Sequence, residues 1–231
     1  MISYPKDWRN RCKNPSFETI DDMVLTILRE LSCSNLSLSG GIDSSLMLYY
    51  LTRLYNKDVK CYTIAGSSDH PDYIYANQIA RHFEVDCFCF IPNKIDKRED
   101  DYPGDEIVRA FYQNLLSSHV TRIIACDGID EITGGYYDHA KTPTQEVYYD
   151  YMEKLQLEQL EPLNRTSLDV EVLLPYMDYR LISLISFVPT WEKFGSGYRK
   201  KIIYDLAKGK VPDEILERRK YGFVDAMVIK N

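Results

Sequence analysis

The chain has 231 residues, of which 45% are hydrophobic, and a formal net charge of −7. This length and composition suit one α/β domain with a sizeable core, and the acidic balance argues against a general nucleic-acid-binding protein. No apolar run approaches the roughly 18 to 20 residues of a membrane-spanning helix, and the N-terminus lacks the apolar centre of a signal peptide, so we expect a soluble, cytoplasmic protein without membrane partners.

The first half of the chain alternates between helix and strand patterns. Apolar residues recur at helical spacing in four segments, 17–32, 46–54, 70–83 and 105–118. Short apolar runs bounded by turn residues predict four strands, 36–38, 59–65, 85–91 and 122–126. Such alternation predicts a mostly parallel sheet with helices on both faces. The charged stretch 92–104 has no periodicity and is expected to be a mobile loop.

The second half of the chain, beyond Thr144, is mainly helical. The predicted helices are 145–160, 179–187, 198–208 and 212–219. Because they are short, they need the sheet to bury their apolar faces. We therefore expect a single domain, with an α/β core over 35–143 and a helical part over 144–231 that completes the site.

The cysteines are scattered, without the paired Cys-x-x-Cys spacing of a zinc or redox site. Cys87 and Cys89 alternate, so both should face one side of the strand predicted at 85–91. The cysteines are expected to be small, buried, apolar residues in a reducing compartment rather than a disulfide framework.

The segment 39–45, Ser-Gly-Gly-Ile-Asp-Ser-Ser, lies between a predicted strand end and a predicted helix start. Its two glycines let the backbone turn sharply, and the N–H groups at the helix start can face an anion. Its serines add hydroxyl donors, and Asp43 could hold a divalent cation among phosphate oxygens. These features predict a pyrophosphate cradle. The alternative is a helix cap with no ligand.

A second motif, Asp127 to Tyr136, follows the strand predicted at 122–126. Its three carboxylates within five residues repel one another unless a cation or a proton offsets their charge. Because the carboxyl ends of parallel strands share one edge of a sheet, Asp43 and Asp130 could together bind one Mg²⁺ that also holds phosphate oxygens. An exposed acidic turn is the alternative.

Two further motifs follow, and the order of all four is informative. The motifs are SGGIDSS at 39–45, DGIDEITGGY at 127–136, LLPYMDYRL at 173–181, and Arg218-x-Lys220-x-Gly222-Phe223. Together with Lys200, in a predicted helix before Val211-Pro212, they resemble the synthetase domain of asparagine synthetase, which β-lactam synthetase shares. SGGIDSS itself is similar to the PP-loop of ATP pyrophosphatases, and no Gly-Lys-Ser/Thr of a Walker loop follows it.

The resemblance implies a mostly parallel, five-stranded sheet of the adenine nucleotide alpha hydrolase type, with ATP and Mg²⁺ as cofactors. It assigns the two metal-binding carboxylates to Asp43 and Asp130. It assigns ATP and pyrophosphate binding to Leu38, Ser39, Gly40, Gly41, Asp43, Ser44, Ser45, Ala65, Cys126 and Lys200, with backbone contacts to adenosine from Leu38, Ala65 and Cys126.

Two catalytic roles also follow from the resemblance. Lys200 matches the lysine thought to stabilise negative charge as an acyl-adenylate forms and is attacked, and Asp127 occupies the place of a glutamate proposed as the base for the attacking amine. From the sequence alone, Lys200 could instead be a solvated charge in Arg199-Lys200-Lys201. Likewise, Arg218 and Lys220 could contact phosphates or be surface charges.

The chain departs from the family pattern in three respects. Asp127 is one methylene shorter than the family glutamate, and Leu173 stands where an arginine is usual. The N-terminal glutaminase domain of asparagine synthetases is absent from these 231 residues. We therefore expect nitrogen to come from free ammonia, a separate glutaminase subunit, or an amine on the substrate.

The resemblance implies an ATP-dependent synthetase that adenylates a carboxylate, with aspartate as a candidate, and transfers it to ammonia or an amine, releasing AMP and pyrophosphate. One alternative is a PP-loop enzyme that adenylates a nucleobase or a tRNA position, which the acidic body and the missing Cys-x-x-Cys pairs disfavour. Another is a non-catalytic nucleotide-binding homologue.

Overall fold

A computed structural model describes residues 16–92, 94–194 and 199–218 of the chain. Five parallel strands form one sheet in the order β3-β2-β1-β4-β5, which confirms the predicted fold class. The strands are β1 (Asn35–Ser37), β2 (Lys60–Ile64), β3 (Asp86–Phe90), β4 (Arg122–Ile124) and β5 (Glu171–Leu173). Four of them lie within two residues of the segments predicted from apolar runs.

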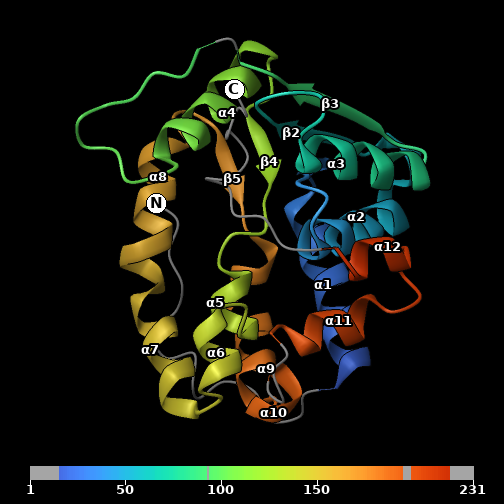
Figure 1. The fold of residues 1–231 in the computed structure, drawn as a ribbon. Helices are drawn as coiled ribbons and strands as arrows, with labels where there is room; N and C mark the ends of the chain where they lie inside the picture. The colour runs from blue at the N-terminus through green and yellow to red at the C-terminus, as the bar shows by residue number, and fades with distance from the viewer. Residues whose placement is uncertain (1–15, 93, 195–198, 219–231) are drawn as a thin grey trace.

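Helices cover both faces of the sheet and extend beyond its carboxyl edge (Figure 1). The longer helices are α1 (Phe17–Leu31), α2 (Ile42–Tyr55), α3 (Pro71–His82), α4 (Asp105–Ser117), α7 (Gln145–Leu155) and α9 (Tyr179–Phe187). The shorter ones are α5 (Ile129–Thr133), α6 (Tyr137–Lys141), α8 (Glu161–Thr166), α10 (Thr190–Lys193), α11 (Lys201–Ala207) and α12 (Asp213–Leu216). No helix of the described residues is long and apolar enough to cross a membrane.

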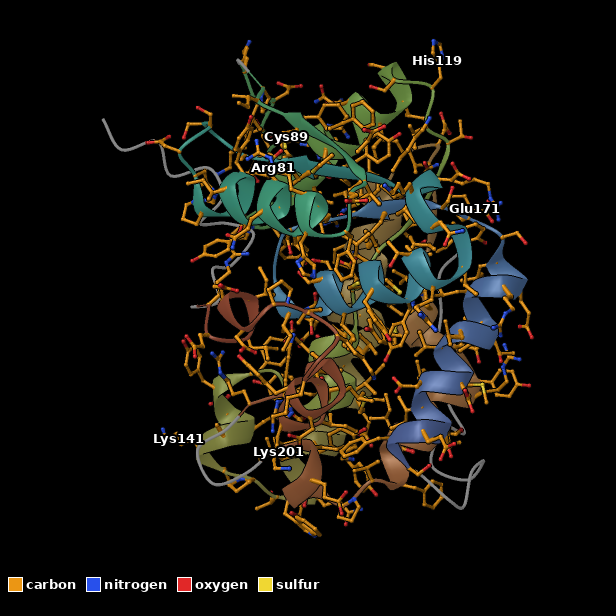
Figure 2. The ribbon with its side chains drawn as sticks, turned by 90° about the vertical axis from the view of Figure 1, so that its right-hand side faces the viewer. Arg81, Cys89, His119, Lys141, Glu171 and Lys201 are labelled. Atoms are coloured by element: carbon orange, nitrogen blue, oxygen red, sulfur yellow. The ribbon has the colours of Figure 1, made fainter. Side chains whose placement is uncertain are left out.

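The core has one part on each face of the sheet because successive strand residues point to opposite faces. Ile124 on β4 joins the larger apolar cluster, which includes Ile20 of α1 and Leu46 of α2. Its neighbour Ile123 joins the smaller cluster with Phe111 of α4 and Leu163 of α8. Figure 2 looks onto the side covered by α1, α2 and α3.

The strand β3 lies at one edge of the sheet and carries the two alternating cysteines. The Sγ atoms of Cys87 and Cys89 are 3.9 Å apart, so both side chains face the same side of the strand, as predicted. The cysteines among the described residues, namely Cys33, Cys61, Cys87, Cys89 and Cys126, are free thiols.

The second half of the chain departs from its predicted elements in three places. Residues 171–173 form the edge strand β5, which no sequence pattern located. The helix predicted over 145–160 does not end there but continues through a π-helical turn at Gln156–Leu160 into α8. The helix predicted from residue 198 begins only at Lys201. Lys200 precedes it with a φ of 52°, so its expected place inside a helix is wrong.

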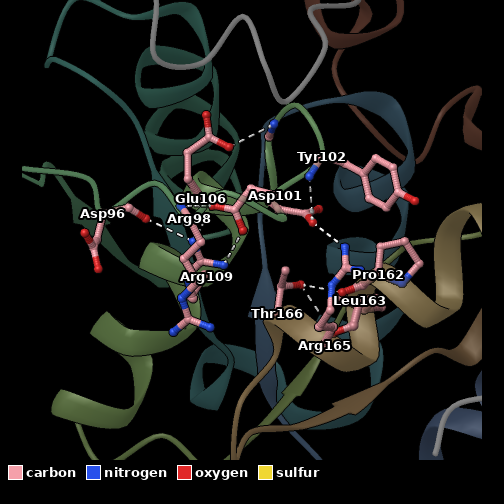
Figure 3. Close-up of polar contacts among 12 residues, drawn as sticks. Asp96, Arg98, Asp101, Tyr102, Glu106, Arg109, Pro162, Leu163, Arg165 and Thr166 are labelled. Carbon is pink, nitrogen blue, oxygen red and sulfur yellow. Dashed lines mark hydrogen bonds and ion pairs between the residues drawn. The ribbon is translucent and has the colours of Figure 1, made fainter.

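The stretch 92–104 is a loop as predicted, but among its described residues several polar contacts attach it to the fold (Figure 3). Arg109 on α4 donates to both carboxylate oxygens of Asp101 at 2.7 and 2.6 Å and to the backbone oxygen of Asp96 at 3.0 Å. Asp105, the first residue of α4, accepts from the backbone N–H of Tyr102 in the loop at 3.2 Å and from Arg165 on α8 at 2.6 Å. These contacts oppose the mobility expected from the charged sequence.

The Asp101–Arg109 contact predicts a pH-dependent contribution to stability. Hydrogen bonds from Arg109 lower the pKa of Asp101. A lowered carboxyl pKa stabilises the folded state above the unfolded pKa, and this stabilisation is lost as the pH falls toward the folded-state pKa. The Tm difference between wild type and Asp101→Asn should therefore be full at pH 7 and shrink below about pH 4.

Thermal unfolding measured from pH 7 to pH 3 tests this expectation. Asp100→Asn is the matched control, because the neighbouring Asp100 side chain is exposed. A Tm difference for Asp101→Asn that stays constant across this range would contradict the assigned role of the carboxylate.

Candidate active site

The glycine-containing turn joins the end of β1 to the start of α2. Gly40 adopts a φ of 68°, and a Cβ built on it would lie 2.5 Å from the backbone nitrogen of Ala76 on α3. The turn can approach α3 this closely only because residue 40 has no side chain. Gly41 is the residue immediately before α2, so the free N–H groups of the first turn of α2 follow it directly.

Serine hydroxyls stabilise this turn from within. The Oγ of Ser39 accepts from the backbone N–H of Gly41 at 3.3 Å and lies 3.2 Å from the Oγ of Ser44. The Ser44 hydroxyl also donates to the backbone oxygen of Gly41 at 3.2 Å. Ser45 is fully buried, and its Oγ has no hydrogen-bond partner within the described part of the chain. The Ser44 hydroxyl would have to leave Gly41 O to donate to a ligand, whereas Ser39 can keep accepting from Gly41 while it donates.

The acidic motif forms a tight loop around the short helix α5. The backbone N–H of Gly135 donates to the backbone oxygen of Asp130 at 2.6 Å. A Cβ on Gly135 would lie 1.8 Å from Oδ1 of Asp130 and 2.5 Å from Cε of Lys200. The second glycine of the Gly-Gly pair therefore leaves room for the side chains of Asp130 and Lys200.

Lys200 joins the glycine turn to the acidic loop. Its backbone N–H donates to the backbone oxygen of Gly134 at 3.1 Å. Its Nζ lies 2.7 Å from Oδ1 of Asp130 and donates to Oδ2 of Asp43. Burial alone would lower the pKa of Lys200, but the charges of Asp43 and Asp130 outweigh it and raise the pKa, so the ammonium stays charged.

The structure thus brings together Asp43, Asp130 and Lys200 from three separate segments of the chain. The Lys200 side chain is only 5% exposed, so it is not a solvated surface charge. Oδ1 of Asp43 is buried and has no hydrogen-bond partner among residues 16–92, 94–194 and 199–218. A buried carboxylate oxygen without a partner is costly, which fits an oxygen that ligates a cation.

These two carboxylates would suit a metal that takes part of its coordination from a ligand. The described residues hold no group of three or more His, Cys, Asp or Glu side chains arranged to bind a metal. Mg²⁺ commonly uses one or two carboxylates and completes its shell with phosphate oxygens and water. Asp43 and Asp130 fit that pattern.

Asp127 precedes α5 and is placed differently from the other two aspartates. Its side chain is exposed, and it forms no ion pair with another described residue. The proposed role as a base remains a prediction that the geometry leaves open.

Glu131 is a buried acid that sequence reasoning counted among the three carboxylates without assigning a role. The hydroxyl of Tyr136 donates to its Oε1 at 2.5 Å. Burial, with a smaller effect of Asp130, raises the pKa of Glu131 to about 7. Glu131 and Tyr136 lie five residues apart, on either side of the Gly134-Gly135 turn. That spacing is the sequence signal that could have suggested their contact.

The residues predicted to contact adenosine through their backbones lie at the carboxyl ends of adjacent strands. The backbone N–H of Leu38 donates to Tyr62 O at 2.8 Å, and that of Ala65 donates to Phe90 O at 3.0 Å. Cys126 follows β4. Leu38 and Ala65 are fully buried, which is consistent with a role limited to their backbone groups.

Arg218 was expected to be a phosphate contact or a surface charge, and its side chain is in fact only 4% exposed. Its guanidinium donates to Ser39 O at 2.9 Å and to the carboxylate of Asp72 on α3, and it lies over the Tyr75 ring. Arg218 therefore fastens the glycine turn to α3. Lys220, Gly222 and Phe223 of the same motif lie outside the described residues.

Comparisons with known proteins match most of the chain. The family model described as asparagine synthase matches residues 20–167 and 139–230. A probable glutamine-hydrolysing asparagine synthetase of Acanthamoeba polyphaga mimivirus is 27% identical over 218 residues, covering 84% of this chain and 40% of that protein. The glutamine-hydrolysing asparagine synthetase of Homo sapiens is 25% identical over 223 residues with the same coverage.

The chain spans about 40% of the length of these curated relatives. Among solved structures, an NH3-dependent NAD synthetase from Campylobacter jejuni, determined with a nitrate ion, has a TM-score of 0.41 and 15% sequence identity. That similarity covers 67% of this chain and 79% of the other.

Proposed function

The chain belongs to the asparagine synthase family, and from that premise we propose that it is an ATP-dependent, amide-forming synthetase that releases AMP and pyrophosphate. The contact of Lys200 with Asp43 and Asp130 carries the proposal, because it unites the glycine turn, the acidic loop and the start of α11 in one buried, charged site. The carboxylate substrate, with aspartate as the candidate, would be activated as its acyl-adenylate.

In the first step, a carboxylate oxygen attacks the α-phosphorus of ATP and pyrophosphate leaves. Two anions approach each other, so the site must supply positive charge and hold the reacting groups in line. The N–H groups of the turn at Gly40 and Gly41 would bind phosphate oxygens. The Lys200 ammonium would stabilise the negative charge on the oxygens of the α-phosphate as the bond to pyrophosphate breaks.

Asp43 and Asp130 would hold Mg²⁺, which when bound supplies positive charge to the pyrophosphate oxygens. The buried, unpartnered Oδ1 of Asp43 supports this assignment.

In the second step, a nitrogen nucleophile attacks the acyl carbon, the bond to AMP breaks, and the nitrogen loses a proton. Asp127 would accept that proton, because its carboxylate is exposed and follows β4 at the edge of the site. The nitrogen would come from ammonia, either free or from a separate glutaminase subunit, or from an amine. We also propose a cytoplasmic location, which the free thiols of the described residues fit.

Analysis of the reaction products tests the proposed function. The purified protein is incubated with ATP, Mg²⁺ and a panel of carboxylic acids, with and without ammonium, and the products are identified by mass spectrometry. AMP, pyrophosphate and an amide should appear in equal amounts. ADP and phosphate would overturn the mechanism, and ATP binding without turnover would indicate a non-catalytic homologue.

Arg218 should affect the affinity for ATP because it positions the glycine turn. We expect Arg218→Lys to raise the Kd of a non-hydrolysable ATP analogue by about 10-fold to 100-fold, the equivalent of losing one hydrogen bond from a charged donor. A lysine ammonium cannot replace the planar fork that spans Ser39 and Asp72. Calorimetric titration measures the Kd.

The control for this prediction is Arg81→Lys, since Arg81 is exposed on the same helix as Asp72 and is labelled in Figure 2. It should bind the analogue as wild type does. If Arg218→Lys lowers Tm while the Kd stays at the wild-type value, the arginine stabilises the fold without positioning the turn.

A further inference from the structure

A pocket separate from the candidate active site lies among α7, α9 and α10, which are together at the lower end of the molecule in Figure 1. Its volume of about 330 Å³ is within the range of roughly 300–1,000 Å³ that small-molecule sites have. The residues of its lining that carry the argument are Tyr149, Ser186, Phe187, Thr190, Trp191 and Lys193. We call it the Lys193 pocket.

The pocket combines exposed aromatic rings with a buried amine. Trp191 and Phe187 are 67% and 42% exposed, whereas Lys193 is only 1% exposed. Exposed rings at a hollow gain stability when a ligand covers their apolar surface. A ligand in this pocket would therefore contact aromatic rings on its outer side and a lysine on its inner side.

The charge of Lys193 is poorly balanced by its surroundings. No carboxylate of residues 16–92, 94–194 and 199–218 forms an ion pair with it, and burial lowers the pKa of Lys193 to about 7. Lysine is almost never fully buried unless it is paired with an opposite charge, because a buried charge without one is costly. An anion in the pocket would supply the missing charge.

The contacts that the ammonium does make leave it able to bind a ligand. Nζ donates to the backbone oxygen of Ser186 at 3.2 Å and lies 3.6 Å from the centre of the Tyr148 ring. A lysine ammonium has three N–H groups, and the aromatic face attracts its charge without taking them all. A carboxylate is a stronger acceptor than a neutral carbonyl or a ring.

The lining also indicates which kind of anion fits. Lys193 is the one charged side chain among the described residues of the lining, so the pocket suits a ligand with a single negative charge. A carboxylate has that charge at neutral pH, whereas a phosphate monoester carries about −1.5 to −2. Phe187 and Trp191 provide apolar surface for the rest of the ligand.

We propose that the Lys193 pocket is a second binding site, for a monocarboxylic acid with an aromatic body. The carboxylate pairs with the Lys193 ammonium, and the ring of the acid packs against Phe187 and Trp191. This site is additional to the proposed reaction, and it requires neither ATP nor Mg²⁺.

Binding of a simple aromatic acid in the absence of nucleotide tests the proposal. Phenylacetate is the probe, and phenylacetamide is its uncharged counterpart. Trp191 reports occupation of the pocket by its fluorescence once the second tryptophan, Trp8, is removed by Trp8→Phe. Phenylacetate should change the Trp191 emission saturably and bind about 10-fold to 100-fold more tightly than phenylacetamide, the equivalent of one hydrogen bond from a charged donor.

Lys193→Met should raise the Kd of phenylacetate to about that of phenylacetamide and leave the Kd of phenylacetamide unchanged. Lys154→Met is the matched control, because it removes an exposed lysine of α7 that pairs with Asp150 at 2.6 Å. It should bind phenylacetate as the parent protein does, and so should Lys200→Met. Weakening by Lys200→Met equal to that by Lys193→Met would place the acid in the candidate active site and overturn the proposal.

The comparison of acid and amide covers the case in which Lys193→Met does not fold, because it leaves the lysine in place. Equal affinities for phenylacetate and phenylacetamide would overturn the role of the ammonium. An unchanged Trp191 emission with both compounds would overturn the site. Since no ATP is present, these results do not depend on whether the proposed synthetase reaction takes place.

Discussion

Replacing Lys200 by methionine should lower the rate of AMP formation by about 10²–10³-fold, the range seen when one preorganised electrostatic contact to a transition state is removed. The buried ammonium contacts both proposed metal ligands and would lie close to the developing charge. The substitution also leaves two carboxylates facing each other, so Tm should fall in metal-free buffer and recover with Mg²⁺.

Single-turnover formation of AMP measures this effect without interference from product release. Lys201→Met is the control, because it removes a neighbouring positive charge that is 40% exposed and outside the site. A rate for Lys200→Met within about threefold of wild type would show that the lysine does not act on the transition state.

The second large effect is on stability and concerns the two glycines of the turn. Gly40→Ala should lower the free energy of unfolding by about 2–5 kcal/mol, the sum of a left-handed backbone strain and a packing conflict. The new Cβ would lie 2.5 Å from backbone atoms of both Tyr75 and Ala76, which a side-chain rotation cannot relieve.

Gly41→Ala is the matched control for this prediction. Gly41 has a φ of −77°, which alanine adopts freely, and among the described residues its added Cβ would meet only the Oγ of Ser39, at 3.3 Å. Its effect should stay within about 1 kcal/mol. Urea denaturation of both variants gives the comparison, and similar losses for the two would show that contact with α3 does not decide the need for Gly40.

Sequence patterns predicted the parts of the fold that have a clear period. Apolar runs located β1 to β4, and the alternation of strands and helices gave the parallel sheet. The edge strand β5 was not located because Glu171–Leu173 is too short to show a period. Its position comes from pairing with β4, where Arg122 faces Glu171.

Only the site residues that lie within a sequence motif could be placed from the sequence. The two aspartates follow strand ends, so the parallel sheet brings them to one edge. The position of Lys200 just before α11 was missed, since lysine favours helices and nothing in Arg199-Lys200-Lys201 signals a left-handed residue. The burial of Arg218 depends on Asp72, 146 residues away, and no local pattern carries that information.

The lysine that completes the charged site lies 157 residues after Asp43, which affects the protein during its synthesis. A ribosome releases the chain from its N-terminus, so Asp43 and Asp130 leave the exit tunnel well before Lys200. A nascent sheet would carry both carboxylates with no lysine between them. Cellular Mg²⁺ can screen their repulsion during this interval. Once the last helices fold against the sheet, the Lys200 ammonium contacts both carboxylates.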